Sequence, residues 1–319
     1  MRYVTYVSPA TSGRRVGIVD GDEIRGLVDD GQLIDLLGDD GARLAAAADS
    51  ARRDPYEVVP LATAVLAAPV PTPPSVRDFM AFEAHVANSM RALGRDVDPD
   101  WYKLPVFYFT NPAAVHGPYD EVAVSPGSAQ FDYELEVAAV VGREGVDLHP
   151  EDAEAHIAGY TILCDWSARD VQMREMRQLL GPVKGKDSAT SLGPMLVTPD
   201  ELAPYRRSGA FDLGMRAFVN DRQYSQGTLA DLYWTFGQML AYASRGTRLV
   251  PGDVIGCGTV GTGCILELSR LHGSEAYPWL QPGDEVRLEV DQLGEIRARI
   301  APGAPVVSLR PERPAAEAS

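Results

Sequence analysis

The sequence predicts a β-rich α+β fold, and three observations support this prediction. Short apolar runs separated by turn residues fill the first 37 residues, a pattern typical of a small β-rich module. Comparable runs that follow Pro-Gly-Asp turns return at residues 253–257 and 284–290. Between these parts, residues 79–90 and 229–245 are expected to be helical. A chain of 319 residues is long enough for one large domain and one small domain.

The net charge and the cysteines indicate which partners and which cellular compartment to expect. The formal net charge is −16 at pH 7, with 45 acidic against 29 basic side chains, so we expect no nucleic-acid partner. Cys164, Cys257 and Cys264 lack metal-site spacing and suit a reducing compartment, with the last two in the core. No apolar run approaches the ~20 residues of a membrane helix, and no signal segment is recognised. We therefore expect a cytoplasmic protein with no membrane partner.

The N-terminal part is predicted to be a small separate domain. Strands are expected over residues 3–7, 15–19 and 23–28, followed by a helix over residues 42–53. The segment 70–75, Val-Pro-Thr-Pro-Pro-Ser, ends this part, because proline fixes φ and removes a backbone donor. We expect a small domain at 1–72, a second domain at 73–309 and a disordered tail at 310–319.

The second domain is expected to open with a helix. Ser75 can serve as its N-cap, and apolar residues from Phe79 to Met90 recur at helical spacing. This spacing puts Asp78 and His85 near one face. Residues 91–120 are then expected to form an aromatic-rich loop, and a loop of that length is more often a lid or a binding loop than filler.

An acidic segment follows at residues 131–142, Phe-Asp-Tyr-Glu-Leu-Glu-Val-Ala-Ala-Val-Val-Gly. If it forms a strand, Asp132, Glu134 and Glu136 share one face, because strand side chains alternate. Three neighbouring carboxylates repel one another unless protons or a cation neutralise them, which favours a hard divalent metal. An edge strand with a solvated acidic face is the alternative, and this segment alone leaves both interpretations open.

Two later segments carry further polar groups. Asp165 follows a short predicted strand at 159–164, where an aspartate commonly caps a helix, and taken alone that interpretation is preferred. Residues 181–191 form a glycine-punctuated loop with two lysines, whose glycine spacing is not that of a phosphate loop. Beyond it we expect a hairpin turn at 220–223 and strands over 253–257, 264–268, 284–290 and 294–300.

Four motifs occur in order along the chain. Residues 164–172 read Cys-Asp-Trp-Ser-Ala-Arg-Asp-Val-Gln, a run that is hard to obtain by chance. Glu134-Leu-Glu136 precedes it, Gly-Pro-Val-Lys-Gly-Lys at 181–186 follows it, and Gly258-Thr259 with Leu-Glu-Leu at 266–268 comes later. With these motifs, about residues 75–300 resemble the fumarylacetoacetate hydrolase family. The resemblance implies a mixed β-sandwich roll, a small N-terminal domain and assembly as a homodimer.

The resemblance also implies a metal site made of oxygen ligands. The matching positions, which follow the pattern of the longer family members, are Asp78, Glu134, Glu136 and Asp165. Such ligands suit Mg²⁺, the expected metal, with Mn²⁺ or Ca²⁺ as alternatives. Lys186 and Thr190 match positions beside the metal that orient the carboxylates. Asp132 has no matching ligand role and is expected to be a hydrogen-bonding neighbour.

Catalytic and substrate-binding positions are carried over in the same way. His85 matches the general base and Glu267 the glutamate paired with it, while Lys186 and Arg169 are expected to stabilise negative charge. The positions expected to contact substrate are Tyr108, Gln172, Thr259, Met80 and Met176. The two methionines replace tyrosines of the family pocket, which predicts a less acidic and more apolar acyl portion in the substrate than in fumarylacetoacetate. Arg95 is a candidate for binding a far carboxylate.

The resulting hypothesis is metal-dependent hydrolysis of a carbon-carbon bond in a small dicarbonyl compound. The substrate would be a β-diketone or 2,4-dioxo acid, such as an acylpyruvate or a fumarylacetoacetate-like compound. Water activated by His85 and Glu267 would attack the distal carbonyl, and cleavage would leave an enolate stabilised by the metal. A 2-oxo acid decarboxylase, an enol-keto isomerase and a hydratase are alternatives on the same scaffold. A noncatalytic ligand-binding protein is a more distant alternative.

Overall fold

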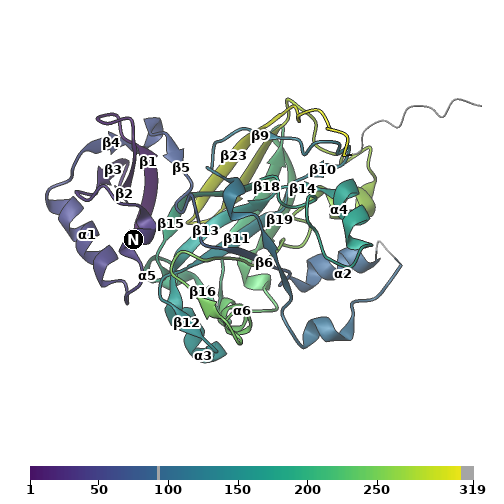
Figure 1. The fold of residues 1–319 in the computed structure, drawn as a ribbon, viewed down its shortest axis with the longest axis horizontal. Helices are drawn as coiled ribbons and strands as arrows, with labels where there is room; N and C mark the ends of the chain where they lie inside the picture. The colour runs from purple at the N-terminus through teal and green to yellow at the C-terminus, as the bar shows by residue number, and fades with distance from the viewer. Residues whose placement is uncertain (92–93, 310–319) are drawn as a thin grey trace, which may run out of the picture.

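The computed structural model describes residues 1–91 and 94–309 and is drawn as a ribbon in Figure 1. The purple N-terminal strands and helix lie at the left, and the other strands and helices form the larger body at the right. The tail predicted for residues 310–319 lies outside the described residues. Within the described part, no helix combines the length and the apolar character needed to cross a membrane.

The N-terminal strands and helix form where the sequence predicts them. Three strands make an antiparallel meander in which Tyr3 pairs with Ile18 and Gly17 with Gly26. The helix packs on the meander and buries Leu44 against it. The bounds in this part are β1 (Arg2–Val7), β2 (Arg14–Asp20), β3 (Glu23–Gly26), α1 (Ala42–Arg53), β4 (Val58–Pro60) and β5 (Leu66–Ala67).

A twelve-stranded sheet runs through the molecule in the order β4-β3-β2-β1-β15-β13-β11-β21-β6-β7, with β5 beside β1 and β8 beside β15. Its other members are β6 (Val76–Phe79), β7 (Phe107–Thr110), β8 (Val115–His116), β11 (Leu135–Val141), β13 (Ile157–Asp165), β15 (Thr190–Val197) and β21 (Val254–Gly256). The N-terminal strands join this sheet through β1, where Tyr3 pairs with Leu196 of β15. The domain boundary near residue 72 stays a prediction, since strands from both sides of it share one sheet.

A second, five-stranded sheet packs on the large sheet in the order β19-β18-β22-β23-β9. Its members are β9 (Val122–Ala123), β18 (Gly214–Val219), β19 (Arg222–Thr228), β22 (Glu285–Val290) and β23 (Gly294–Ala301). One apolar core contains Val137 and Ile162 from the large sheet and Ala217 and Leu288 from the smaller one. The two sheets therefore form a sandwich around a shared core, which confirms the predicted β-rich α+β fold.

The hairpin turn predicted at residues 220–223 is confirmed. Asn220 and Asp221 join β18 to β19 with φ values of 50° and 63°. Positive φ at both central positions is typical of the tightest hairpin turns, and Asn and Asp tolerate it. Three short strand pairs lie outside the two large sheets: β10 (Phe131–Asp132) with β14 (Ser167–Ala168), β12 (Gly145–Val146) with β20 (Arg248–Leu249), and β16 (Arg206–Arg207) with β17 (Ala210–Phe211).

Helices cover the ends and the outer faces of the sandwich. Figure 1 shows α3 beside α6 at the bottom of the body and α2 and α4 at its right. The α-helices after the first are α2 (Glu83–Arg91), α3 (Pro150–Ala153), α4 (Arg169–Met176), α5 (Pro199–Leu202), α6 (Phe236–Ala243) and α7 (Ile265–His272). The 3-10 helices are η1 (Leu33–Leu36), η2 (Leu61–Thr63), η3 (Pro99–Tyr102), η4 (Pro112–Ala114), η5 (Glu154–His156), η6 (Ala203–Tyr205) and η7 (Leu229–Asp231).

The helix predicted to open at Ser75 is wrong, because residues 76–79 form the buried strand β6 between β21 and β7. Ser75 donates to Asp253 Oδ1 at 2.7 Å instead of capping a helix, and α2 begins only at Glu83. Pairing on both edges and burial of all four side chains outweigh the helical spacing. The predicted loop at 91–120 also contains β7, which pairs with β6.

The strand predicted at residues 264–268 is wrong as well, because these residues begin helix α7. Asp132 accepts hydrogen bonds from the backbone N–H groups of Ile265 and Leu266 at 2.7 Å and 3.0 Å. A carboxylate far away in the sequence therefore caps this helix and satisfies donors that a helix N-terminus leaves free. The apolar run alone could not reveal this contact.

Candidate active site

Four carboxylates converge where the central strands of the large sheet end. Asp78 lies on β6, Glu136 on β11 and Asp165 at the end of β13, while Glu134 lies just before β11. In the sheet order β13-β11-β21-β6, only β21 separates β11 from β6. Each residue offers an oxygen, and these oxygens lie within 4.8 Å of one another. The structure thus brings together the four predicted ligand positions.

Gly256 on β21 leaves room for this carboxylate cluster. It pairs with Asp78 of β6 on one side and with Ala138 of β11 on the other. A Cβ atom at position 256 would lie 2.5 Å from Asp78 Oδ1 and 3.2 Å from Glu136 Oε2. Any side chain larger than hydrogen would therefore displace a carboxylate, which is why glycine is required here.

Burial makes the carboxylate cluster costly to ionise. The exposed fraction is 3% for Asp78, 5% for Glu134, 0% for Glu136 and 1% for Asp165. Loss of solvation raises the pKa of Asp78, and it raises the pKa of Glu136 and of Asp165 well above the ordinary range. The charge of Asp78 raises the pKa of Glu136 further. A cluster of this kind needs either protons or a cation to neutralise it.

Two buried cations balance part of this negative charge. Lys186 Nζ donates to Glu134 Oε2 and, at 2.5 Å, to Asp165 Oδ2, while Arg169 Nη2 lies 2.7 Å from Glu134 Oε1. Burial opposes ionisation of Glu134, but Arg169 and Lys186 overcome it and hold the pKa of this carboxyl below its usual range. Despite their own burial, both cations have a raised pKa because carboxylates surround them. Glu134 is therefore the member that stays ionised most readily.

The uncommitted oxygens of the cluster fit a hard divalent cation. Oδ1 of Asp78 and Oδ1 of Asp165 are buried, and neither has a hydrogen-bond partner within the described residues. The Tyr108 hydroxyl donates to Asp165 Oδ2 at 2.5 Å and lies 3.3 Å from Asp78 Oδ2, so it orients both carboxylates. A donor set made only of oxygen matches Mg²⁺, Mn²⁺ or Ca²⁺ and disfavours thiophilic ions.

His85 and Glu267 form a hydrogen-bonded pair beside the carboxylate cluster. His85 lies on α2 and Glu267 on α7, two helices that pack together. His85 Nδ1 lies 2.6 Å from Glu267 Oε1. Glu267 Oε2 accepts hydrogen bonds from Asn88 Nδ2 at 2.8 Å and from the Thr262 backbone N–H at 3.0 Å. Because Nδ1 faces the carboxylate, Nε2 is the ring nitrogen left for proton transfer.

A cavity of about 340 Å³ lies over the cluster and reaches His85, and its size suits a small molecule. The predicted site residues that line it are Asp78, Met80, His85, Tyr108, Glu134, Glu136, Arg169, Gln172, Met176, Lys186 and Thr259. Asp165, Thr190 and Glu267 do not line it. Asp165 and Glu267 instead contact lining residues, and Thr190 pairs with Asp165 between β15 and β13.

Several lining residues were missed from the sequence. They are Phe79, Ser89, Val106, Phe107, Met173, Pro182, Leu266 and Arg270. The prediction of a strand over residues 264–268 ended before Arg270 and hid its relation to Leu266, whereas on α7 residues four apart share a face. Had α7 been recognised, its helical period would have placed Leu266 and Arg270 on one face of the helix. Arg95, the earlier candidate for a far carboxylate, is exposed and does not line the cavity.

Asp132 lies outside the carboxylate cluster and connects the surrounding elements. It is fully buried, and Nε and Nη2 of Arg169 both lie 2.8 Å from its Oδ2. Burial raises the pKa of Asp132, although Arg169 opposes this rise. Since Arg169 opens α4 and Asp132 caps α7, this pair holds both helices beside the cavity. The expected role of Asp132 as a hydrogen-bonding neighbour agrees with these contacts.

The three cysteines lie outside the carboxylate cluster, and the thiol of Cys264 lies 3.7 Å from Glu267 Oε1, beside the His85–Glu267 pair. Cys164, Cys257 and Cys264 are all buried and free, so the core positions predicted for Cys257 and Cys264 are confirmed. Burial raises the pKa of each thiol, which keeps it neutral and unreactive.

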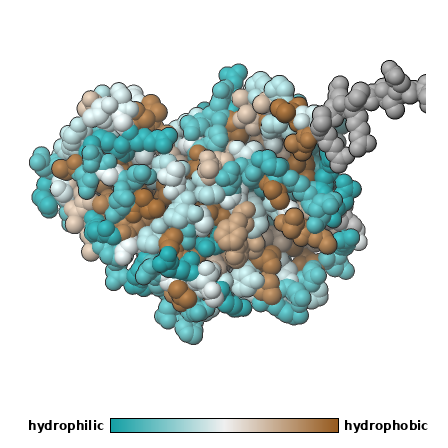
Figure 2. All heavy atoms as spheres, in the orientation of Figure 1, coloured by the Kyte–Doolittle hydropathy of each residue, from teal (hydrophilic) through white to brown (hydrophobic). Residues whose placement is uncertain are grey.

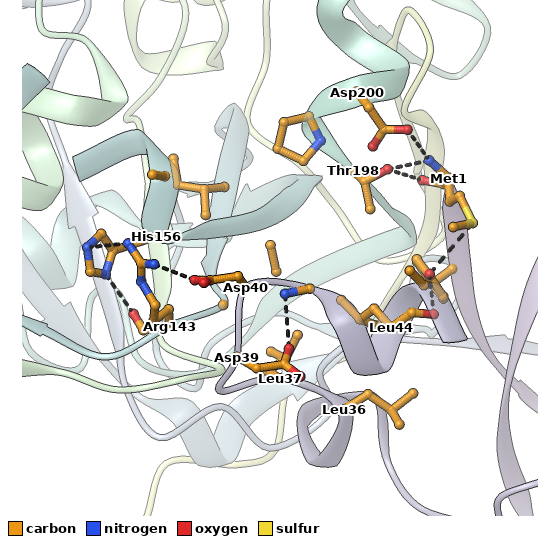
Figure 3. A pocket seen from close by; sticks show the side chains of 18 residues that line it. Met1, Leu36, Leu37, Asp39, Asp40, Leu44, Arg143, His156, Thr198 and Asp200 are labelled. Carbon is orange, nitrogen blue, oxygen red and sulfur yellow. Dashed lines mark hydrogen bonds and ion pairs between the residues drawn. The ribbon is translucent and has the colours of Figure 1, made fainter. Parts of the chain in front are cut away.

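A second cavity, of about 240 Å³, lies between the N-terminal part and the body (Figure 3). Its charged groups have partners, among them Arg43 for Asp39 and the Met1 amino group for Asp200. Arg143 contacts Asp40 and, at 3.2 Å, His156 Nε2, whereas the Met1 amino group donates to Thr198. No buried cluster of carboxylates comparable to the one above lines this cavity within residues 1–91 and 94–309. The first cavity is therefore the candidate active site.

Known proteins share both the sequence and the fold of this chain. Mitochondrial oxaloacetate tautomerase of Homo sapiens is 35% identical over 197 residues, which cover 61% of this chain and 58% of that protein. Fumarylacetoacetase of Oryza sativa subsp. japonica is 29% identical over 294 residues, covering 75% and 68%. The chain thus spans 58% of the length of the human relative.

Solved structures match nearly the whole chain. Maleylpyruvate hydrolase from Sphingobium sp. SYK-6, in complex with manganese(II) and pyruvate, has a TM-score of 0.70 at 26% identity and covers 95% of this chain and 100% of its own. 5-Carboxymethyl-2-hydroxymuconate delta-isomerase from Mycobacterium smegmatis matches the fold with a TM-score of 0.68 at 23% identity, covering 95% and 100%. The fumarylacetoacetate (FAA) hydrolase C-terminal family matches residues 75–301. With that match over most of its length, the chain belongs to the fumarylacetoacetate hydrolase family.

Proposed function

We propose that this protein is a metal-dependent hydrolase that cleaves a carbon-carbon bond in a β-diketone or a 2,4-dioxo acid. The observation that carries the proposal is the His85–Glu267 pair. His85 Nδ1 lies 2.6 Å from Glu267 Oε1, and His85 lines the same cavity as the carboxylate cluster. Hydrolysis needs a base that can deprotonate water next to a polarised carbonyl. A base and an oxygen-rich cation site in one cavity meet both needs.

The chain's own groups would divide the reaction between them. His85 Nε2, with Glu267 stabilising the imidazolium, takes a proton from water, and the resulting hydroxide adds to the distal carbonyl carbon. The carbon-carbon bond then breaks, giving a carboxylic acid and an enolate that takes up a proton to become the second product. Gln172, Arg169 and Lys186 line the cavity, and the N–H groups that they have free would stabilise the negative charge as it develops.

The proposed reaction requires a divalent metal ion, and the four carboxylates of the cluster are its proposed ligands. Asp78, Glu134, Glu136 and Asp165 would hold it, with Thr190 and Lys186 beside them. A divalent cation there would supply a Lewis acid that polarises the dicarbonyl and neutralises the carboxylates. We propose Mg²⁺ as the native ion, with Mn²⁺ or Ca²⁺ as alternatives that a metal titration would rank. The manganese in the structure of the Sphingobium maleylpyruvate hydrolase supports an ion of this hard class.

The cavity walls support a substrate with an apolar acyl portion. Met80 and Met176 line the cavity together with Phe107 and Val106, whereas Tyr108 and Thr259 add hydroxyl groups close to the carboxylates. Thioether side chains adapt their shape to an apolar group and offer no strong hydrogen bond. An acylpyruvate would place its oxo acid end at the cluster and its acyl chain among these residues.

A tautomerase or isomerase is the second candidate, because a human oxaloacetate tautomerase is 35% identical over 197 residues. Such a reaction moves a proton without breaking the carbon skeleton, and it could use the same base. The hydrolase and the tautomerase give different products, so identifying the products distinguishes the two candidates. A decarboxylase or a hydratase would likewise be recognised by its products.

The test is a screen of the purified protein with acylpyruvates and β-diketones in the presence of Mg²⁺ or Mn²⁺. We expect the enol absorbance to fall while one equivalent each of pyruvate and carboxylic acid appears, and we expect a chelator to stop both changes. Enol-keto interconversion without acid release would establish the tautomerase instead. Release of CO₂ without cleavage products would establish a decarboxylase, and tight binding without turnover would establish a carrier.

We also propose that the protein works as a homodimer in the cytoplasm. Light scattering of the purified chain would measure its molar mass, and a monomer at micromolar concentration would contradict the dimer. Fractionation of cells that express the natural protein would test its location.

A further inference from the structure

Cys264 adds a sulfur donor to the His85–Glu267 pair. Nδ1 of His85, Sγ of Cys264 and Oε1 of Glu267 all lie within 4.8 Å of one another. Oε1 lies 2.6 Å from Nδ1 and 3.7 Å from Sγ. The proposed mechanism uses the histidine and the glutamate but gives the thiol no role. A thiolate, an imidazole and a carboxylate are donor types that tetrahedral zinc sites use in proteins.

The elements around the cavity explain why these three donors meet. Cys264 immediately precedes α7, and Glu267 lies in the first turn of this helix. His85 lies on α2, which packs against α7. Cys264 also pairs with Glu134 in an isolated antiparallel bridge, which fixes its backbone beside the carboxylate cluster. The three donors therefore adjoin the carboxylate cluster but share no ligand with it.

The second oxygen of Glu267 is already held in place. Oε2 accepts hydrogen bonds from Asn88 Nδ2 at 2.8 Å and from the Thr262 backbone N–H at 3.0 Å. Because Oε1 faces the imidazole and the thiol, an ion can bind Oε1 without breaking either hydrogen bond to Oε2. Hydrogen bonds of this kind orient a ligating carboxylate and increase its affinity for the ion.

The donor atoms need only a small adjustment to bind zinc. Bonds of about 2.0–2.3 Å at tetrahedral angles separate neighbouring donor atoms by about 3.3–3.6 Å. The distance between Sγ and Oε1 is already close to this range, whereas Nδ1 and Oε1 must move apart by about 0.7 Å. His85 lines the cavity, so its ring can move toward open space, and water from the cavity can fill the fourth position.

Zinc binding would leave these buried groups without a net charge. The ligands are then a thiolate, a carboxylate and a neutral imidazole, and their two negative charges equal the charge of the ion. Burial raises the pKa of the Cys264 thiol, so the ion must displace the thiol proton. This proton passes to solvent, and the ring proton of His85 moves from Nδ1 to Nε2. One proton is therefore released for each ion bound.

We propose that His85, Cys264 and Glu267 form an inhibitory zinc site distinct from the carboxylate cluster. Zinc at Nδ1 leaves the ring proton on Nε2, and this nitrogen then cannot accept a proton from water. The inhibition rests on the proposed function, because it requires Nε2 to be the general base, whereas zinc binding does not. Mg²⁺ prefers the oxygen donors of the carboxylate cluster and competes poorly for a thiolate.

Cobalt(II) is a suitable probe, because it distinguishes this site from carboxylates on the surface. Hydrophilic residues, drawn in teal, cover much of the face shown in Figure 2, and the chain has 45 acidic side chains. Exposed carboxylates hold divalent ions weakly and would obscure a simple metal titration. A bond between Co²⁺ and a thiolate gives a charge-transfer band in the near ultraviolet, and carboxylates give no such band.

The full chain is titrated with Co²⁺ in excess Mg²⁺, and Zn²⁺ is then added. We expect one equivalent of Co²⁺ to produce the thiolate band and Zn²⁺ to remove it. Cys264→Ser should abolish the band, and His85→Ala should weaken Co²⁺ binding by at least about 10- to 100-fold, the loss typical of changing a partner of a metal ligand. Cys164→Ala removes another buried free thiol and, as the matched control, should keep the band. Thermal unfolding shows whether each variant is folded.

Zinc inhibition is measured on a cleaved acylpyruvate at saturating Mg²⁺, relative to the uninhibited rate of each protein. Cys264→Ser should raise the zinc concentration for half-inhibition at least about 10-fold, and additional Mg²⁺ should not restore activity. Inhibition that Mg²⁺ relieves and that Cys264→Ser leaves unchanged would place zinc at the carboxylate cluster and overturn this inference.

The spectra separate the zinc site from the proposed function. A wild type without the thiolate band, or a folded Cys264→Ser variant that keeps it, overturns the zinc site. A band without inhibition of an active wild type overturns the effect of zinc on His85. If no dicarbonyl compound is cleaved, the proposed function fails, and the cobalt spectra still decide whether the three residues bind the ion.

Discussion

Replacing Glu267 by glutamine gives the sharpest test of the proposed base. The carboxylate accepts from His85 Nδ1 on one oxygen and from Asn88 and the Thr262 backbone on the other. A glutamine side chain keeps one acceptor oxygen and replaces the other with an NH₂ donor. If the NH₂ group pointed toward Asn88 Nδ2 and the Thr262 backbone N–H, three hydrogen-bond donors would face one another. We therefore expect the NH₂ group to point toward His85.

The expected loss follows from this geometry. An NH₂ group beside Nδ1 makes Nδ1 an acceptor and puts the ring proton on Nε2, so the nitrogen that faces the cavity cannot accept a proton from water. Loss of general base catalysis costs about 10²- to 10⁴-fold in rate. The exchange also replaces the charge-assisted hydrogen bonds of Glu267 by neutral ones, so the free energy of unfolding should fall by about 1–2 kcal/mol. The carboxylate cluster is untouched, so metal affinity should stay unchanged.

The assay combines kcat on an acylpyruvate cleaved by the wild type with metal titration and urea unfolding. His85→Ala should lose activity to a similar extent, and the double variant should lose little more, because the two residues act as one unit. Glu275→Gln, an exposed glutamate beyond the end of α7, is the matched control. A Glu267→Gln variant that keeps most of the wild-type kcat at full metal occupancy would refute the assigned base.

Four further predictions concern the carboxylate cluster and the residues that support it. The buried carboxyl groups with a raised pKa, such as Glu136, keep protons that the unfolded chain releases above about pH 4. The free energy of unfolding of the metal-free protein should therefore fall as the pH rises toward the pKa values of the folded state. Glu136→Gln should reduce this decline, measured by urea unfolding at several pH values. Added Mg²⁺ should stabilise more at pH 8 than at pH 5, and equal shifts would contradict this. Gly256→Ala should weaken metal binding, measured calorimetrically, because its methyl group displaces Asp78. Asp132→Asn should cost about 3–5 kcal/mol in urea unfolding, since it leaves buried Arg169 without its full partner; a loss below 1 kcal/mol would contradict that role.

Motifs that are continuous in the sequence allowed much of the candidate site to be predicted. Glu134 and Glu136 lie in one strand segment, and Asp165 and Arg169 lie in one run, so their chemistry was visible before any folding was considered. The structure brings these residues together with Asp78 and Lys186, which agrees with the expected group. Their assignment as metal ligands and catalytic groups stays a prediction.

Two secondary-structure predictions made from local sequence patterns were wrong, because contacts with distant residues determine the structure of these segments. The segment after Ser75 has helical spacing, but pairing with β7 and β21 makes it a strand. The segment after Cys264 has the apolar run of a strand, but the carboxylate of Asp132 caps it as a helix. In both cases long-range hydrogen bonds outweigh a weak local preference.

The sequence by itself determined the β-rich composition of the fold, the hairpin at Asn220, the helix at 42–53 and the identity of the reactive side chains, because these depend on residue type and on neighbours along the chain. Only the tertiary structure decided which of these side chains share a cavity. It separated Asp132 from the carboxylate cluster, and it placed Leu266 and Arg270 of α7 on the wall of the cavity. Such relations arise from the packing of strands and helices that lie far apart in the sequence, and no local pattern encodes them.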